Sequence, residues 1–276
     1  SSNYAEDLRI DYSILDQHSE SYRKIRNTFR YLLGNLNDSF DDMDLEKIET
    51  NKLPELEQFM LHKIYNLDVN FNKYFKNYDF HNLYKELLNF CTVDLSAFYF
   101  DIRKDTLYCD PKDSDKRKST ILILNVILNA LVKWFAPILS FTTEEIYQLI
   151  SKKEKSVHLE KFLNIPENFK NIELSKKWSQ LIEIRDACNM SIEEKRALKE
   201  IGSSLEASLE IKINKKLLDI SQNTDFAELC ITSHVKILEH KDESIKVKTI
   251  KAKGTKCPLC WKIKDGKCSR ATCANT

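Results

Sequence analysis

The sequence predicts a mainly α-helical protein: a helical bundle, then a small α+β domain and a C-terminal finger built on four cysteines. Three observations support this fold class. Through the first two thirds of the chain, apolar residues recur every three or four positions, the period of an amphipathic helix. Two short segments, 207–213 and 244–250, alternate apolar and polar residues with the period of a half-buried strand. Four of the eight cysteines lie within residues 257–273.

The first predicted helix spans residues 16–36. Its apolar or aromatic stripe, at steps of four and three residues, consists of His18, Tyr22, Ile25, Phe29, Leu32 and Leu36. Arg23, Arg26 and Arg30 share a different face of the same helix. The pattern therefore predicts one buried face and one charged face.

Further helices follow in order. A second one begins after Pro54, since a proline costs nothing at a helix start, where the first N–H groups lack helical partners. A third carries a stripe through Phe80, Tyr84, Leu87, Cys91, Leu95 and Phe98. After a polar loop at 110–115, residues 121–135 are apolar on most sides and predict a buried central helix, which Pro137 ends. Short loops and apolar stripes together indicate a bundle.

The next helix is expected to begin with a capping box. In this arrangement Thr142 is the N-cap, Glu145 reaches back to it, and Phe141 packs against Ile146. Beyond residue 160 the chain predicts one more long helix, 174–200, and then the two alternating segments of a small α+β unit.

The cysteine-rich end carries the clearest chemistry. Cys257 and Cys260 form a Cys-x-x-Cys turn, and Cys268 and Cys273 supply a second pair at the wider spacing Cys-x4-Cys. Two such pairs of thiolates can complete a tetrahedron around one structural zinc ion. Free thiols or a redox pair are the alternative. With four thiolate ligands no position remains for substrate or water, so we expect this metal to hold a fold and no catalytic residue to lie here.

Basic residues surround this finger. Residues 241–270 hold ten lysines or arginines against three acidic residues, although the whole chain has a net charge of only +1. A local excess of positive charge favours binding to phosphates. Candidate RNA-binding residues are Lys253, Lys256, Lys262, Lys264 and Arg270, together with Arg23, Arg26 and Arg30 of the first helix. Trp261 is expected either to stack on an unpaired base or to cover the metal knuckle.

The bulk composition excludes several classes of protein. With 42% hydrophobic and 31% charged residues, the chain is globular. We find no secretory signal pattern and no apolar run close to the roughly 20 residues of a membrane span, so we expect a cytoplasmic protein. The chain starts at Ser1 within sequence that reads as structured, and we therefore expect a preceding part to be missing.

Several segments together resemble the isoleucyl-tRNA synthetase family. The resembling segments are 1–10, 22–36, 105–110, 134–142, 156–159 and 201–207. Relatives for valine, leucine, methionine and cysteine share the bundle pattern. The isoleucine enzyme is indicated by the bundle together with Ile-Gly-Ser-Ser-Leu-Glu-Ala at 201–207 and the terminal Cys-x-x-Cys-Trp.

The resemblance implies an anticodon-binding bundle and a zinc finger that bind isoleucine tRNA, and a monomeric parent enzyme with no DNA or membrane partner. The parent would attach isoleucine to its tRNA using ATP and Mg²⁺, and would hydrolyse mischarged valine. The His-Ile-Gly-His and Lys-Met-Ser-Lys-Ser motifs of its catalytic domain do not occur in these 276 residues. The family's second Cys-x-x-Cys is also replaced by the wider Cys268–Cys273 pair.

The resemblance divides the chain into four parts: a junction with the catalytic domain (1–15), the anticodon-binding bundle (16–160), a helix with a small α+β domain (161–250) and the zinc finger (251–276). The alternatives are a valyl-type synthetase and a non-enzymatic zinc-finger module or adaptor that binds RNA. A DNA glycosylase of the formamidopyrimidine type has a similar finger, but it requires an N-terminal proline, and this chain has Ser1.

Overall fold

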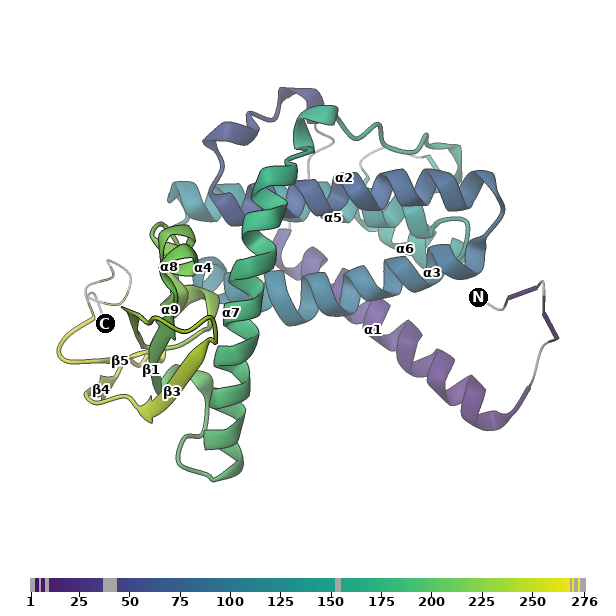
Figure 1. Ribbon diagram of the computed structural model, residues 1–276. Coiled ribbons are helices and arrows are strands. Elements are labelled where there is room, and N and C mark those ends of the chain that lie inside the picture. The colour runs from purple at the N-terminus through teal and green to yellow at the C-terminus, as the bar shows by residue number, and fades with distance from the viewer. Residues whose placement is uncertain are drawn as a thin grey trace. The chain divides into compact units, whose positions relative to one another are not determined.

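The computed structural model describes residues 3–4, 6–7, 10–36, 44–151, 155–268, 270 and 273 (Figure 1). The chain forms two compact units. Unit 1 comprises residues 1–103 and 115–171, and unit 2 comprises residues 104–114 and 172–276. Within the expected junction 1–15, residues 1, 2, 5, 8 and 9 lie outside the described part of the chain.

Unit 1 is a bundle of helices. Its long elements are α1 (Tyr12–Leu36), α2 (Glu55–Lys76), α3 (Phe80–Asn89), the π-helical segment η4 (Phe90–Phe100), α5 (Asp115–Phe135) and α6 (Ser140–Ile150). Short 3₁₀ turns are η2 (Leu45–Lys47), η3 (Thr50–Lys52), η5 (Val157–Leu159) and η6 (Glu167–Phe169). The helix after Pro54 is confirmed, and α2 carries acidic residues in its first turn and lysines in its last, as the helix dipole favours.

The core of unit 1 is arranged around α5, which packs against α1, α2 and α6. The predicted central helix is confirmed, and its side chains from Ile123 to Phe135 are almost all buried. By length and composition α5 would be able to cross a membrane, but 72% of its most apolar stretch is buried inside the protein. Its hydropathy is therefore that of a core helix.

Helix α1 begins at Tyr12, and only its second half is packed. Ile25, Phe29, Leu32 and Leu36 are at most 1% exposed, as the stripe predicts. The prediction was wrong for His18, which is exposed. The buried residues of α1 begin only at Ile25, so the early part of the stripe lies outside the core.

One apolar stripe runs through α3 and η4, but the winding differs from the single α-helix that the sequence predicts. Residues Phe90–Phe100 form a π-helix, in which the hydrogen bonds span five residues. The α-helical form resumes at α4 (Asp101–Cys109), whose first turn belongs to unit 1 and whose remainder belongs to unit 2. Leu87, Cys91 and Leu95 are nevertheless fully buried.

Unit 2 combines the long helix α7 (Ile172–Ala197) with a three-stranded sheet. The elements that follow α7 are η7 (Ser204–Glu206), β1 (Ala207–Ile213), α8 (Lys215–Ser221), α9 (Phe226–Leu229), β2 (His234–Glu239) and β3 (Lys246–Lys251). The strand order is β2-β1-β3, with β1 parallel to β2 and antiparallel to β3. Helix α7 packs against β1 and β3.

The two predicted strands are β1 and β3, whereas β2 was missed. Alternate residues of β1 are buried, including Leu209, Ile211 and Ile213, which is the periodicity that the sequence shows. Strand β2 lacks this alternation, because its side chains are mostly half-buried on both faces. Its existence follows from parallel pairing with β1 after the crossover through α8 and α9.

A short hairpin carries the cysteine-rich turn. Strand β4 (Thr255–Lys256) pairs antiparallel with β5 (Ile263–Lys264). Gly254 precedes the hairpin with φ +124°, and a Cβ added there would lie 2.3 Å from the carbonyl oxygen of Lys264. Only glycine allows the two backbones to approach this closely. The fold class predicted from the sequence is therefore confirmed: mainly α, with a small α+β part and a terminal cysteine cluster.

Candidate functional site

Four cysteine sulfurs gather at the end of unit 2. The Sγ atoms of Cys257, Cys260, Cys268 and Cys273 all lie within 4.8 Å of one another, and none of these residues forms a disulfide. Three of the four side chains are buried. This donor set can hold one metal ion.

The local backbone favours the thiolate form of Cys257, whereas burial raises the pKa of Cys260 and raises that of Cys273 to about 12. Backbone hydrogen bonds from Cys260, and then from Leu259, lower the pKa of the Cys257 thiol to about 7. The turn is closed in both directions, because Trp261 N–H donates to the carbonyl of Cys257 and Cys257 N–H donates to that of Lys262. Amide groups that point at a thiolate favour the charged form that metals bind.

Trp261 occupies an unusual backbone position beside the cluster. Its φ is +61°, in the left-handed region that usually holds glycine, and its side chain is 60% exposed. The Lys256 ammonium lies 5.8 Å from the centre of the indole ring. A large residue in this conformation costs on the order of 1 kcal/mol, and such strain is concentrated at functional sites.

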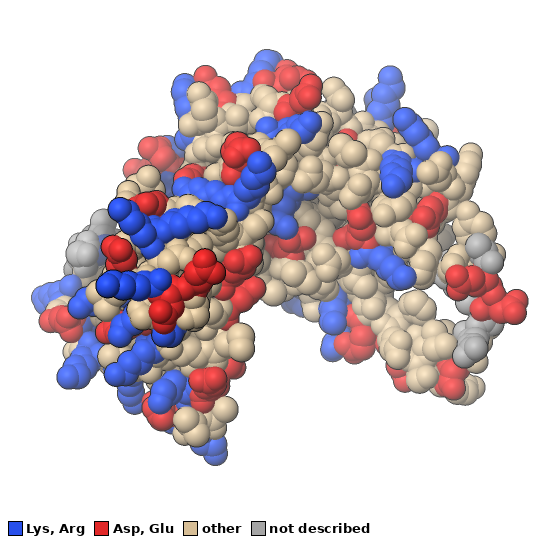
Figure 2. All heavy atoms as spheres, viewed as in Figure 1, with Lys and Arg blue, Asp and Glu red and all other residues tan. Residues whose placement is uncertain are grey.

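Basic side chains lie around the hairpin, where they alternate with acidic ones over the strands of unit 2 (Figure 2). Lys253, Lys256 and Lys264 belong to the hairpin or the residues just before it. Lys262 and Arg270 instead point to carboxylates near the end of α4. Arg270 donates to both oxygens of Asp105 at 2.7 and 2.6 Å, and the Lys262 ammonium lies 3.6 Å from the same group.

The electrostatics of Asp105 reflect this pairing. Burial would raise the pKa of its carboxyl, but the hydrogen bonds from Arg270 and the charge of Lys262 outweigh burial and lower it. The pKa of Arg270 is raised in turn, chiefly by its hydrogen bonds to Asp105. Both groups therefore remain ionised.

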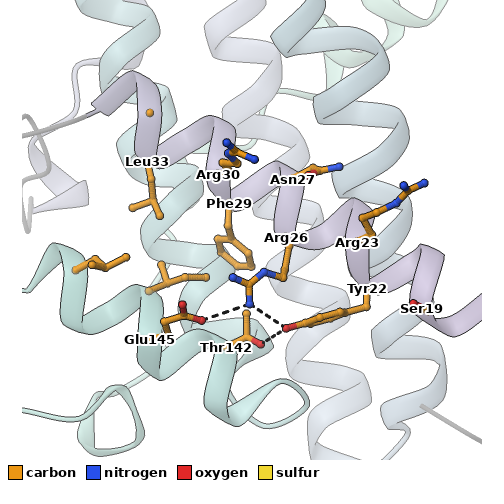
Figure 3. A pocket seen from close by; sticks show the side chains of 13 residues that line it. Ser19, Tyr22, Arg23, Arg26, Asn27, Phe29, Arg30, Leu33, Thr142 and Glu145 are labelled. Atoms are coloured by element: carbon orange, nitrogen blue, oxygen red, sulfur yellow. Dashed lines mark hydrogen bonds and ion pairs between the residues drawn. The ribbon is translucent and has the colours of Figure 1, made fainter.

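A groove of ≈ 780 Å³ lies in unit 1 between α1 and α6 (Figure 3). Its walls contain all three arginines that the sequence singles out, together with residues that it did not. The lining comprises Ser19, Tyr22, Arg23, Arg26, Asn27, Phe29, Arg30, Leu33, Gly34, Thr142, Glu145, Ile146 and Leu149.

A polar network joins the two helices that line this groove. The Tyr22 hydroxyl lies 2.8 Å from the hydroxyl of Thr142, and Arg26 donates to Tyr22 at 3.2 Å and to Glu145 at 3.4 Å. The hydrogen bonds with Thr142, and then with Arg26, lower the pKa of Tyr22. Arg26 thus reaches across the groove to Glu145 (Figure 3), whereas Arg23 pairs with Glu20 of its own helix.

The predicted capping box at the start of α6 was wrong. The helix begins at Ser140, no side chain caps it, and Phe141 is 93% exposed. Thr142 is therefore already inside the first turn, where its hydroxyl meets Tyr22, and Glu145 faces Arg26. Two residues that the sequence assigned to local capping join α1 to α6 instead.

The structure brings the candidate residues together in two groups, one in each unit. The arginines of α1 line the groove of unit 1, and Trp261 with the basic residues of 253–270 surrounds the cysteine cluster of unit 2. Sequence reasoning missed Tyr22 as a groove residue, because it fits the core stripe of α1. It also missed Asp105 and Asp110, whose partners lie more than 150 residues away.

Comparison with known proteins places this fold. The family described as "Anticodon-binding domain of tRNA ligase" matches residues 57–213, more than half of the chain. The chain belongs to this family of tRNA-ligase anticodon-binding domains, in agreement with a helical bundle that carries a basic groove.

The similar proteins are isoleucine–tRNA ligases from several bacteria. The isoleucine–tRNA ligase of Pelagibacter ubique is 68% identical over 270 residues, which cover 98% of this chain and 30% of that protein. Those of Bartonella quintana and Petrotoga mobilis are 40% and 36% identical over 94% and 95% of the chain. The chain thus spans less than a third of the length of these relatives.

Proposed function

We propose that this chain is the tRNA-binding part of an isoleucine–tRNA ligase and that it holds tRNA(Ile) by its anticodon region. The observation that carries the proposal is the identity of 36 to 68% to isoleucine–tRNA ligases along nearly the whole chain, together with the match to the anticodon-binding family. The two basic groups of residues supply the chemistry that such a part requires.

The chemistry of the whole enzyme would lie elsewhere. Activation of isoleucine with ATP and Mg²⁺, transfer to tRNA and hydrolysis of mischarged valine need a nucleotide-binding site and an editing site. This sequence contains neither His-Ile-Gly-His nor Lys-Met-Ser-Lys-Ser. The contribution of the chain is to hold the tRNA so that its distant acceptor end is oriented for reaction.

The metal of the finger is proposed to be one structural Zn²⁺. Zinc–thiolate bonds of roughly 2.3 Å in a tetrahedron separate the sulfurs by about 3.8 Å. The Sγ atoms of Cys260 and Cys268 are 3.9 Å apart. Zinc would stabilise the hairpin and its turn, which bury too little apolar surface to fold without help.

RNA contact is proposed at both groups of residues. In unit 1, Arg30 makes no ion pair with another described residue, and Arg23 is paired only with exposed Glu20, so both guanidinium groups can reach phosphates. In unit 2, the exposed indole of Trp261 is available for an unpaired base, and Lys253, Lys256 and Lys264 for its phosphates.

The remaining assignments follow from the same proposal. The functional parts are the junction 1–15, the anticodon-binding bundle 16–160, the α+β part 161–250 and the zinc finger 251–276. We place the parent enzyme in the cytoplasm as a monomer, because protein synthesis occurs there and thiolate metal sites persist in a reducing compartment.

The decisive experiment is filter binding of the zinc-loaded chain to transcripts of tRNA(Ile), tRNA(Val) and tRNA(Met). We expect tRNA(Ile) to bind at least about 10-fold more tightly than the others, a difference of about 1.4 kcal/mol. Tighter binding of tRNA(Val) would indicate a valyl-type enzyme. Equal binding of all three would indicate a general RNA-binding module and refute the proposal.

A variant series tests the groove. The double change Arg23→Gln/Arg30→Gln should reduce the salt dependence of tRNA binding, with the slope of log K against log salt falling by about 1 to 2. Arg196→Gln is the matched control, since Arg196 is an exposed arginine of α7 that pairs with Glu193 as Arg23 pairs with Glu20. An equal slope for both variants would exclude the groove from RNA binding.

A further inference from the structure

The second cysteine pair of the finger is spaced by four residues, and this spacer contains Arg270. A longer spacer has more conformations to lose when the ligands are brought together, so it needs more ordering than a two-residue knuckle. Arg270 is tied to the fourth cysteine through the backbone, because Cys273 N–H donates to the Arg270 carbonyl at 3.0 Å. This hydrogen bond restrains Cys273 relative to Arg270.

Each cysteine pair has a cation that reaches the same carboxylate. Lys262 lies two residues after Cys260, and Arg270 lies two residues after Cys268. Both side chains converge on Asp105, and Arg270 also approaches Asp110 at 3.4 Å. The fork-to-fork pair of Arg270 and Asp105 has the charge-assisted bidentate geometry that fixes orientation most strongly.

The pair is shielded from water, which strengthens it. The side chains of Asp105 and Arg270 are 21% and 29% exposed, and that of Lys262 is 15% exposed. One helical turn beyond Asp105, Cys109 packs against the cysteine cluster, and its thiol lies 4.0 Å from the carbonyl of Leu259. The end of α4 thus contacts the finger through two residues on one face.

We infer that Asp105 is a positioning residue for the metal centre, acting through Arg270 and Lys262. It holds both cysteine pairs in the arrangement that binds the metal and offsets the entropy of ordering the four-residue spacer. Partners beyond the ligands themselves commonly change metal affinity 10- to 100-fold in this way.

A second consequence concerns RNA. Lys262 and Arg270 form ion pairs with Asp105 and Asp110 within unit 2. Phosphate contact by the finger therefore depends on the remaining candidate cations, Lys253, Lys256 and Lys264. A substitution of Arg270 should therefore act on metal binding, whereas a substitution of Lys256 should act on RNA binding.

Zinc affinity of the whole chain, measured by competition with a chromophoric chelator, tests the inference. Asp105→Asn and Arg270→Gln should each weaken zinc binding on the order of 10-fold. The double variant should lose less zinc affinity than the product of the two single losses, because the Arg270–Asp105 pair is removed by both changes. Asp242→Asn is the control, since this carboxylate of unit 2 pairs with Lys246 away from the metal cluster.

The outcomes are distinct. Equal zinc affinity of Asp105→Asn and Asp242→Asn overturns the inference, and so does a double variant whose loss is the product of the two single losses. If Asp105→Asn loses its helical circular dichroism signal, Arg270→Gln decides the same question, since Arg270 is outside the regular elements. Absence of zinc binding by the unaltered chain would refute the metal proposal itself, and the inference with it.

A final experiment, the salt dependence of tRNA binding, distinguishes a role of Arg270 in metal positioning from a role in RNA contact. At saturating zinc, Arg270→Gln should leave the salt dependence of tRNA binding unchanged, whereas Lys256→Gln should lower its slope by about 1. Equal slopes for the two variants would overturn the assignment of Arg270 to the metal centre alone.

Discussion

Arg103 donates two hydrogen bonds of 2.6 Å to the two carboxylate oxygens of Glu57, and both side chains are buried inside unit 1. The hydroxyls of Tyr99 and Thr120 also donate to Glu57, at 3.2 and 3.4 Å. The carboxylate is therefore surrounded by donors, and the network joins α2, η4, α4 and α5.

Breaking this pair should destabilise unit 1 strongly. Glu57→Gln removes the charge that compensates buried Arg103, and we expect the free energy of unfolding to fall by about 3 kcal/mol. Urea unfolding followed by circular dichroism at 222 nm measures the change. Glu49→Gln, which alters the exposed pair with Lys52, should cost less than about 0.5 kcal/mol. A loss equally small for Glu57→Gln would contradict the role of the network.

The stability of unit 1 should depend on pH through Asp68. Burial raises the pKa of this carboxyl to about 6, although the hydrogen bond that Asn72 donates at 3.0 Å opposes the rise. The folded-state pKa lies above the unfolded value, so ionised Asp68 lowers the free energy of unfolding. This destabilisation is complete above about pH 6 and disappears as the pH falls to about 4. Asp68→Asn should therefore stabilise the protein at pH 7.5.

Allowing for partial solvent exposure, we expect that gain to be about 1 to 2 kcal/mol at pH 7.5 and to shrink through pH 5. Denaturant unfolding at several pH values measures it. Asp186→Asn, at an exposed position of α7, is the control. A gain that does not change with pH would show that the charge of Asp68 is not its cause.

Trp261 should contribute to RNA binding without contributing to metal binding. Stacking on a base is worth about 1 to 3 kcal/mol, so Trp261→Ala should weaken tRNA binding about 10-fold while zinc content stays at one per chain. Trp261→Phe keeps an aromatic face and should retain most of the affinity. If zinc is lost on substitution by alanine, the indole instead covers the metal knuckle.

Removal of a metal ligand should unfold the hairpin only. Cys257→Ser and Cys273→Ser should lose zinc by elemental analysis, and hydrogen exchange should then become fast at β4 and β5 while β1 stays protected. Cys91→Ser, at a buried cysteine of unit 1, should keep its zinc. Retention of zinc by Cys257→Ser would remove this residue from the ligand set.

The features that depend on residues close together in the chain were predicted from the sequence. The packed half of α1, the central helix α5, strands β1 and β3 and the four clustered cysteines were all predicted, because each is specified by local periodicity or spacing. The resemblance to isoleucyl-tRNA synthetases also rests on local segments, and the comparisons confirmed it.

The features that the sequence did not predict depend on contacts with residues that are distant along the chain. The departure of Thr142 and Glu145 from a capping box is set by α1, whose Tyr22 and Arg26 bind these two side chains. Strand β2 has no alternation of its own and exists because β1 offers it an edge.

By itself, then, the sequence determined most of the helices, strands β1 and β3 and the thiols that can share a metal, because those properties follow from local periodicity and spacing. Tertiary structure alone decided which charges remain available to a ligand. Arg270 and Arg30 are both basic residues in the sequence. Arg270 pairs with Asp105, which is 165 positions away along the chain, whereas Arg30 lines a groove. Charge acts through space, so its use is fixed only when the chain has folded.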